Sequence, residues 1–308
     1  MLQLTLLKYE RYRYLKAATL LTALSITAYM LDSKPVSGAY GGTWLGYLFG
    51  FIASLIVVMQ FWYGIRRRLT PKRTGRRGRS NYASLQRGTA DRQGQKTSWI
   101  PSNSVTLQGW LSAHVYFGTS LAVLATLHSG FQFGWNIHTF AYVLMMLVIM
   151  SGFYGVYAYL HYPRLMTGNM GGDTLDMLLF KIDDLDELVL LKSLQFSDEV
   201  CAIVLKACQG TQIGGNFLQV ITAYHRKCPT VKAVQQLSLL GKNLNGDQLK
   251  SFHDIFSIMV NKEALVTRAR LDVMYKARLE FWLYLHTPLA IAFLAALLAH
   301  IVAIFFYW

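Results

Sequence analysis

Charged side chains are scarce in this sequence. Of its 308 residues, 15% are Asp, Glu, Lys or Arg, whereas soluble domains carry about 25%. Hydrophobic residues make up 53% and aromatic residues 14%. This composition argues against an ordinary soluble enzyme, a disordered chain and a fibrous protein. The many aromatic residues fit a protein that lines two membrane–water interfaces.

Motifs for nucleotides and for covalently held cofactors are also missing. The sequence has no G-x-G-x-x-G and no P-loop. Its three cysteines, Cys201, Cys208 and Cys228, form neither C-x-x-C nor C-x-x-C-H. Iron–sulfur ligation and covalent haem attachment therefore have no support, and we interpret these thiols as reduced and structural.

Long uncharged runs dominate what is present. They cover residues 44–65, 110–133, 137–160 and 281–308, and each exceeds the roughly 18 residues that indicate a transmembrane helix. A fifth run, 17–31, spans if Lys16 and Tyr14 reach the interface. Alternatively, it is a signal peptide cleaved near Ser37-Gly38-Ala39. The favoured fold is an all-α, polytopic membrane protein with five transmembrane helices.

The cations predict the orientation. Residues 66–97 carry eleven Lys and Arg against one acid, Asp91, whereas 132–136 are uncharged. For a protein of a bacterial inner membrane, the positive-inside rule predicts that the N-terminus, this basic loop and residues 162–280 lie in the cytoplasm. The C-terminus is then expected on the periplasmic side. The loop is interpreted as a topology signal resting on anionic lipid. The alternative, nucleic-acid binding, lacks interleaved aromatic residues, so no nucleic-acid partner is expected.

The predicted organisation has six parts. They are an N-terminal cytoplasmic segment with helix 1 (1–43), helix 2 (44–65), the basic loop (66–107), helices 3 and 4 (108–161), a small helical cytoplasmic cap (162–280) and helix 5 (281–308). His161-Tyr162-Pro163 is expected to end helix 4, or else to border a quinone pocket. No Gly or Pro lies between Asp247 and Pro288, so we expect one continuous helix into helix 5.

Two histidine pairs carry the functional information. His114 and His128 are fourteen residues apart on helix 3, as are His286 and His300 on helix 5. Fourteen residues return a helical side chain to within about 40° of the same face, about 21 Å along the axis. Because helices 3 and 5 are predicted to be parallel, His114 should match His286 in depth and His128 should match His300.

Facing imidazoles at two depths suit the axial positions of two haem irons. Three alternatives stay open: hydrogen-bonded polar residues within the membrane, zinc, and a proton relay. Zinc is a poor competitor because no Cys or carboxylate shares these levels. Arg164, Lys276 and Arg278 are candidate propionate partners near the inner haem, and Trp135, Asn136 and His138 near the outer one; solvated interface residues are the simpler interpretation.

The H-x13-H pattern on two helices resembles the di-haem cytochrome b family over residues 44–161 and 281–308. The resemblance implies a four-helix haem bundle, with one extra N-terminal helix here and two non-covalent haems b held by His114, His128, His286 and His300. Family glycines that let porphyrins pack closely match Gly50 and Gly64, and Gly118 is a further candidate. Close helix packing is the alternative for Gly46 and Gly50.

The chain departs from the family in lacking a Pro-Glu-Trp-Tyr motif, so outer quinol oxidation is not carried over. It also resembles bacterial cytochrome b/b6-domain proteins. The leading expectation is transmembrane electron transfer between quinone and a periplasmic cytochrome or other redox protein, with a possible cytoplasmic partner on the cap. The alternatives are the haem subunit of a ferric or other small-molecule reductase with a separate flavoprotein, and a haem-free membrane interaction protein.

Overall fold

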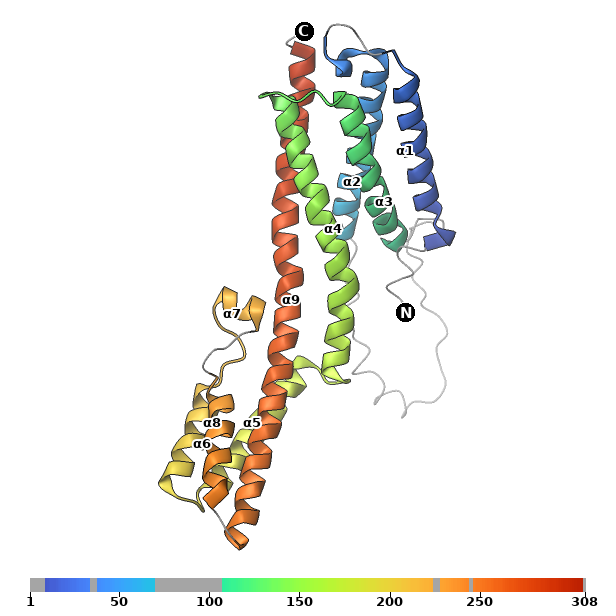
Figure 1. Cartoon of the computed structure of the whole chain (residues 1–308). Helices are drawn as coiled ribbons and strands as arrows, with labels where there is room; N and C mark the ends of the chain where they lie inside the picture. Colours follow the sequence, from blue (N-terminus) through green and yellow to red (C-terminus); the bar gives the residue numbers. More distant parts are fainter. Residues whose placement is uncertain (1–8, 34–37, 70–106, 224–227, 244–245, 307–308) are drawn as a thin grey trace, which may run out of the picture. The chain divides into compact units, whose positions relative to one another are not determined.

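The computed structural model describes residues 9–33, 38–69, 107–223, 228–243 and 246–306 (Figure 1). Residues 1–8, most of the basic loop, Ser37, His225 and Trp308 lie outside them. In these ranges the chain is helical and has no strand. The α-helices are α1 (Arg13–Leu31), α2 (Trp44–Leu69), α3 (Leu107–Ser129), α4 (Ile137–Met170), α5 (Leu175–Ser193), α6 (Asp198–Gly210), α7 (Phe217–Thr222), α8 (Pro229–Leu240) and α9 (Asp247–Phe306).

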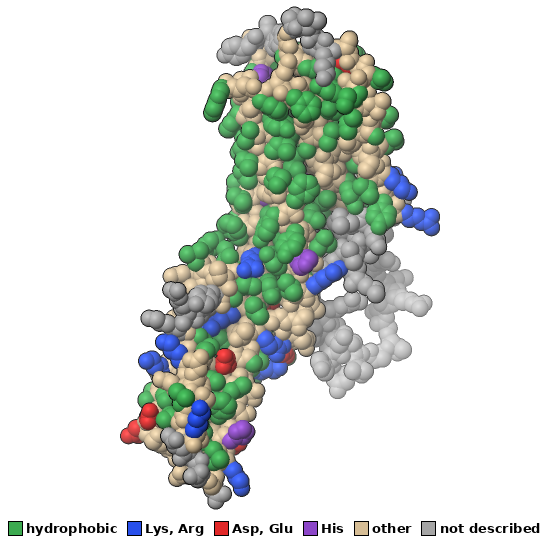
Figure 2. Space-filling view, viewed as in Figure 1, with side chains coloured by type: hydrophobic (Ala, Val, Ile, Leu, Met, Phe, Trp, Pro, Cys, Tyr) green, Lys and Arg blue, Asp and Glu red, His purple; other side chains and the backbone are tan. Residues whose placement is uncertain are grey.

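The all-α membrane prediction is confirmed. Five described helices are long and apolar enough to cross a bilayer: α1, α2, α3, α4 and α9. The chain divides into two units, one of residues 1–149 and 292–308 and the other of residues 150–291. Figure 2 shows hydrophobic side chains covering the first unit and charged side chains gathered on the cap helices of the second.

The first unit is built from α1, α2, α3, the start of α4 and the end of α9. Its core contains Phe49, Ile56, Leu124, Met145 and Phe293. Small polar side chains let α1 and α3 approach closely, since the buried Ser120 hydroxyl contacts the Ala18 carbonyl at 3.2 Å. In this unit α3 and the end of α9 run in the same direction (Figure 1), which brings their C-terminal ends to one level.

The second unit contains the rest of α4 and α9 together with the cap helices α5–α8. Val189, Val204, Leu237, Ile255 and Met259 are buried between α5, α6, α8 and α9. Thr174 caps α5 by accepting a hydrogen bond from the Met177 amide, whereas Ser197, which precedes α6, makes no side-chain capping hydrogen bond. Asp247 to Phe306 is one helix, so the predicted continuous rod is confirmed.

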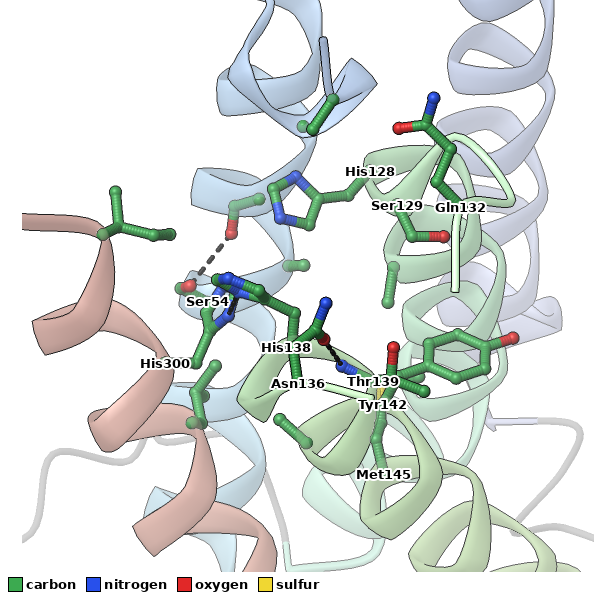
Figure 3. A pocket seen from close by; sticks show the side chains of 18 of the residues that line it. Ser54, His128, Ser129, Gln132, Asn136, His138, Thr139, Tyr142, Met145 and His300 are labelled. Carbon is green, nitrogen blue, oxygen red and sulfur yellow. Dashed lines mark hydrogen bonds between the residues drawn. The ribbon is translucent and has the colours of Figure 1, made fainter. Parts of the chain in front are cut away.

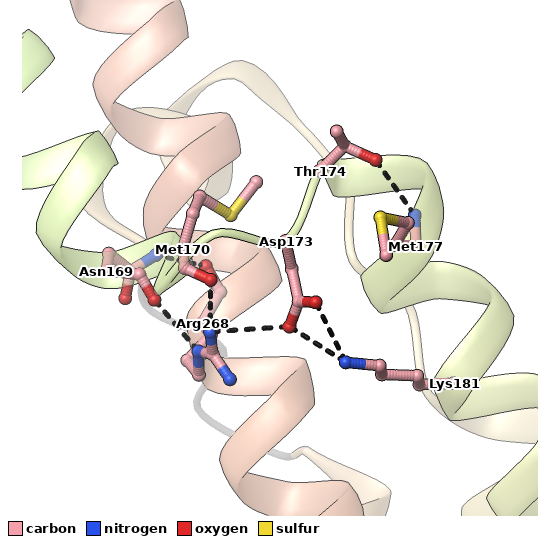
Figure 4. A network of polar contacts seen from close by, with 7 residues as sticks. All are labelled: Asn169, Met170, Asp173, Thr174, Met177, Lys181 and Arg268. Atoms are coloured by element: carbon pink, nitrogen blue, oxygen red, sulfur yellow. Dashed lines mark hydrogen bonds and ion pairs between the residues drawn. The ribbon is translucent and has the colours of Figure 1, made fainter. Parts of the chain in front are cut away.

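The expected end of helix 4 at Pro163 is wrong, because α4 continues through this proline to Met170. A proline costs its helix one hydrogen bond, and contacts with α9 hold the segment beyond it (Figure 4). Arg268 Nε donates to the Asn169 carbonyl at 2.8 Å, and Asn169 Nδ2 donates to the Arg268 carbonyl at 2.7 Å. The helix ends where Gly171 and Gly172 adopt positive φ.

Candidate functional site

Three histidines meet at one end of the first unit (Figure 3). His128 is the penultimate residue of α3, His138 is the second residue of α4, and His300 lies near the end of α9. The turn between α3 and α4 is short, with Gly130 and Phe131 at positive φ, so His138 returns to the level of His128. The parallel course of α3 and α9 supplies His300 at that level.

The rings of His128 and His300 have the spacing of two ligands on one metal ion. Their centroids are 6.1 Å apart and their planes are inclined by 84°. A histidine nitrogen binds a metal at about 2 Å and the ring centre lies about 1 Å farther, so rings on opposite sides of one ion have centroids about 6 Å apart. The centroid separation of the predicted outer pair is therefore close to that of two ligands on one ion, and metal binding by this pair stays a prediction.

A backbone carbonyl fixes the tautomer of His128. Its Nδ1 atom lies 2.7 Å from the Gly46 carbonyl oxygen on α2. A carbonyl only accepts, so Nδ1 carries the proton and the Nε2 lone pair is left for a ligand. Metal-binding histidines are commonly oriented by such a hydrogen bond from the second ring nitrogen.

The sequence did not predict the contact between His138 and His300. Their Nδ1 atoms are 2.5 Å apart and their ring centroids 4.5 Å, so one of the two nitrogens carries the shared proton. The sequence carries a signal for this contact, because His138 opens helix 4 at the depth of the outer pair, but it predicts only a propionate donor or a solvated interface residue there. Of the two other outer candidates, Asn136 instead caps α4 by accepting a hydrogen bond from the Thr139 amide at 2.9 Å, and Trp135 is fully exposed.

Gly50 makes room for an imidazole. A Cβ at this position would lie 2.8 Å from His128 Cε1 and 2.9 Å from Nδ1, distances that side chains do not tolerate. Within the described residues, the glycine thus serves close packing of α2 against His128. A porphyrin contact at Gly50 stays a prediction.

The three imidazoles line a cavity of about 380 Å³, within the range of small-molecule sites. Its wall comes from α2, α3, α4 and α9 and is mostly apolar, with the polar side chains Ser54, Ser129, Gln132, Asn136 and Thr139 among its lining. Gly41 and Gly42 of the turn before α2 complete one side.

The turn before α2 is held to the α3–α4 connection. Tyr40 is 2% exposed, and its amide donates to Gln132 Oε1 at 3.0 Å. Its hydroxyl donates to Asp32 Oδ2 at 3.0 Å. Burial, followed by this hydrogen bond, raises the pKa of Tyr40 to about 12, so the phenol stays protonated. The turn before α2, which lines this side of the cavity, is therefore held by two hydrogen bonds of Tyr40, one to the Gln132 amide oxygen and one to the Asp32 carboxylate.

His114 lies in the first unit, on α3. Gln60 Nε2 of α2 donates to its carbonyl at 2.9 Å, and its ring lies 5.0 Å from that of Tyr63. Gly118 faces the same amide, since a Cβ there would lie 3.3 Å from Gln60 Nε2. At Gly64 a Cβ would meet no atom within 4 Å.

His286 lies in the second unit, where α4 orients it. Its Nδ1 atom is 2.7 Å from the Ser151 hydroxyl, and Trp282 Nε1 donates to the Ser151 carbonyl at 2.7 Å. A Cβ at Gly155 would overlap the Trp282 indole. This arrangement was not predicted from the sequence, although the small-residue S-G-x-x-G pattern at 151–155 is typical of close helix packing.

His114 and His286 belong to different units, so their pairing stays a prediction. Of the inner propionate candidates, Arg278 donates from Nε to the Ile221 carbonyl at 2.9 Å and lies 6.0 Å from the centre of the Tyr162 ring. Across the described ranges, no three His, Cys, Asp or Glu side chains gather as ligands for a metal ion. Each predicted haem needs only two axial ligands from the protein, so its site would not form such a group of three.

Comparisons with family models, with curated proteins and with solved structures give no match to this chain. The site is therefore interpreted from its own geometry: a histidine-lined cavity in the first unit and a hydrogen-bonded histidine in the second.

Proposed function

We propose that the chain is a transmembrane electron-transfer protein that binds two non-covalent b-type haems. The observation that carries the proposal is the His128–His300 pair, whose ring centroids lie 6.1 Å apart beside a cavity of about 380 Å³. Bound haem would supply a one-electron carrier, whose potential the protein tunes through ligands, hydrogen bonds and burial.

Two features of the donor set support haem binding at the outer position. His128 offers Nε2 because Gly46 holds its Nδ1 proton, and His300 meets His138 through Nδ1, which leaves its own Nε2 outside that contact. Leu121, Ala125, Phe293 and Leu297 of α3 and α9 supply apolar walls. Such walls exclude water, and low polarity around a haem is one means of setting its potential.

The inner haem of the proposal uses His114 and His286. His286 has the same kind of support as His128, since a polar group on a neighbouring helix, the Ser151 hydroxyl, engages Nδ1 at 2.7 Å. The equal spacing of the two pairs in the sequence supports the proposal of one haem in each leaflet.

We place the protein in a bacterial inner membrane with the cap in the cytoplasm, on the strength of eleven cations against one acid in 66–97. Electrons would pass between quinone and a periplasmic redox protein. The test of orientation is a reporter inserted at Gly134, expected to be active only in the periplasm, and one at Gly214, expected to be active only in the cytoplasm. A Gly134 reporter active only in the cytoplasm, together with a Gly214 reporter active only in the periplasm, would show the opposite orientation of the protein in the membrane.

One set of contacts favours a second candidate, a haem-free membrane interaction protein. His128, His286 and His300 each have a polar partner in the structure, on Gly46, Ser151 and His138. Hydrogen bonds of this kind between helices stabilise membrane bundles without any cofactor.

A reduced-minus-oxidised spectrum of the purified protein separates the candidates. We expect low-spin, six-coordinate haem at two per chain, extractable in acid acetone. His300→Ala should lower the haem content, whereas His253→Ala, at an exposed position of the cap, should not. Absence of haem from protein produced with adequate haem supply would favour the second candidate. Reduction by a quinol analogue, rather than by NADPH with a flavoprotein, separates quinone-linked transfer from the reductase alternative.

A further inference from the structure

The short helix α7 in the second unit exposes large apolar side chains. Phe217 is 59% and Leu218 is 73% exposed, whereas the core residues Val204, Leu237 and Ile255 of the cap are fully buried. Figure 1 shows α7 beside α9 and away from the packed α5, α6 and α8. The helix is thus not part of the cap core.

Well-defined contacts hold α7 in place. Asn216 and Gln219 form a reciprocal capping box at its start. Arg278 Nε of α9 donates to the Ile221 carbonyl at 2.9 Å, and the Phe217 ring lies edge-on to that of Phe281, 5.4 Å away. Leu218 is therefore exposed on a helix that is held in place by other contacts.

The docking point on α9 coincides with a change in composition. Lys276, Arg278 and Glu280 are charged, and no charged residue follows from Phe281 to Trp308. Cations followed by aromatic residues mark the interface at which a helix enters the hydrocarbon. Because Arg278 and Phe281 are the residues that hold α7, this helix lies at the level of that interface.

We propose that α7 inserts Phe217 and Leu218 into the boundary between headgroups and acyl chains of the leaflet that α9 enters, with lipid as the partner. Helices that lie in this boundary bury their apolar side chains about 5–10 Å deep. Lipid is favoured as the occupant because Phe217 is continuous, through Phe281, with the membrane-spanning part of α9. The proposal is independent of haem.

The test measures the depth of a nitroxide on Leu218→Cys. The full chain, with Cys201, Cys208 and Cys228 replaced by Ser, is reconstituted in vesicles of phosphatidylethanolamine and phosphatidylglycerol. Collision with oxygen and with a nickel chelate should place the label about 5–10 Å below the headgroups. The matched control is Leu239→Cys on α8, which is 62% exposed and should be open to nickel.

Two outcomes would overturn the proposal. A Leu218 label as open to nickel as the Leu239 label would place α7 in water, and one shielded from both reagents would indicate a protein partner. A second measurement keeps all native cysteines: Leu218→Asp should raise hydrogen exchange in residues 216–223 of the vesicle-bound chain and leave α8 unchanged. Leu239→Asp should alter neither segment, and equal exchange in Leu218→Asp and the unsubstituted chain would contradict membrane insertion.

Discussion

The Nδ1 atom of His128 lies 2.7 Å from the carbonyl oxygen of Gly46, one helical turn before Gly50. The two glycines have complementary effects on one imidazole. The Gly46 carbonyl accepts a hydrogen bond from Nδ1–H and so fixes the tautomer, and Gly50 leaves the space that the ring fills. The segment of α2 from 46 to 50 thus orients a residue of α3.

Gly50→Ala tests this relationship. Its Cβ would lie 2.8 Å from His128 Cε1, so we expect the ring to shift and the outer haem to be lost. Adding a methyl group to a packed site costs about 1–3 kcal/mol. Haem content and thermal unfolding of the purified protein measure both effects. The control is Gly168→Ala, where a Cβ meets nothing within 4 Å. Full haem content in Gly50→Ala would show that the His128 position is not critical.

Removing one partner of the buried ion pair in the cap should destabilise the cap. Lys262 on α9 has no exposed side-chain area and pairs with Asp186 of α5, while its Nζ donates to the Ala207 carbonyl at 3.2 Å. Removing one partner of a buried pair costs about 3–5 kcal/mol. Because 20% of the Asp186 side chain is exposed, we expect the loss of stability in Lys262→Ala to lie at the lower end of this range. Urea unfolding of the cap measures it.

An apolar replacement of both partners provides the rescue. Lys262→Met with Asp186→Leu should recover most of the lost stability, since well-packed apolar pairs often match buried ion pairs. Lys192→Ala is the matched control: it breaks the exposed Lys192–Asp254 pair and should change the unfolding midpoint little. Equal destabilisation by Lys192→Ala and Lys262→Ala would contradict a role for burial.

The Cys208 thiol should be unreactive in the folded cap. Desolvation by burial raises its pKa from 9.0 to about 12; the neighbouring Lys262 ammonium opposes part of this rise, and the Asp186 carboxylate adds to it. A shift of this size lowers the thiolate fraction near pH 8 roughly a thousandfold. The protonated thiol favours the folded state, so this contribution is complete below the unfolded pKa, near 9, and is lost as pH rises through about 12.

Alkylation rates of a chain with Cys201→Ser and Cys228→Ser measure this prediction. The rate should keep rising with pH beyond 9 in the folded cap, and unfolding in urea should restore ordinary reactivity. A plateau with a midpoint near 9 in the folded protein would show that the thiol is not desolvated.

The sequence predicted those parts of the fold that depend on hydrophobicity and periodicity. Uncharged runs are sufficient for five membrane helices because only a helix satisfies its own backbone in hydrocarbon. The equal fourteen-residue spacing from His114 to His128 and from His286 to His300 likewise predicted that His128 and His300 would lie at one depth, since the rise and rotation per residue of a helix are constant.

Contacts to backbone atoms and contacts that override local rules were not predictable. The partner of His128 is a carbonyl, and every residue of α2 carries one, so side-chain identity gave no signal. The sequence predicts that α4 ends at Pro163, but the helix continues, and Arg268 holds the part beyond the proline through Asn169, which lies 99 residues earlier in the chain. The docking of α7 on Arg278 depends on the same kind of long-range bond.

The pairing of the four histidines is the sharpest test of the proposed function. If His128 and His300 share one haem and His114 and His286 share the other, loss of either member of a pair should damage the same cofactor. The double variant His128→Ala/His300→Ala should then resemble either single variant, because residues acting on one unit are non-additive. The same should hold for His114→Ala with His286→Ala. The crosswise double His114→Ala/His300→Ala should lose both haems and show summed changes in the redox titration. The 6.1 Å separation of the His128 and His300 rings supports this pairing over the antiparallel one. A crosswise double that loses only one haem would exclude it.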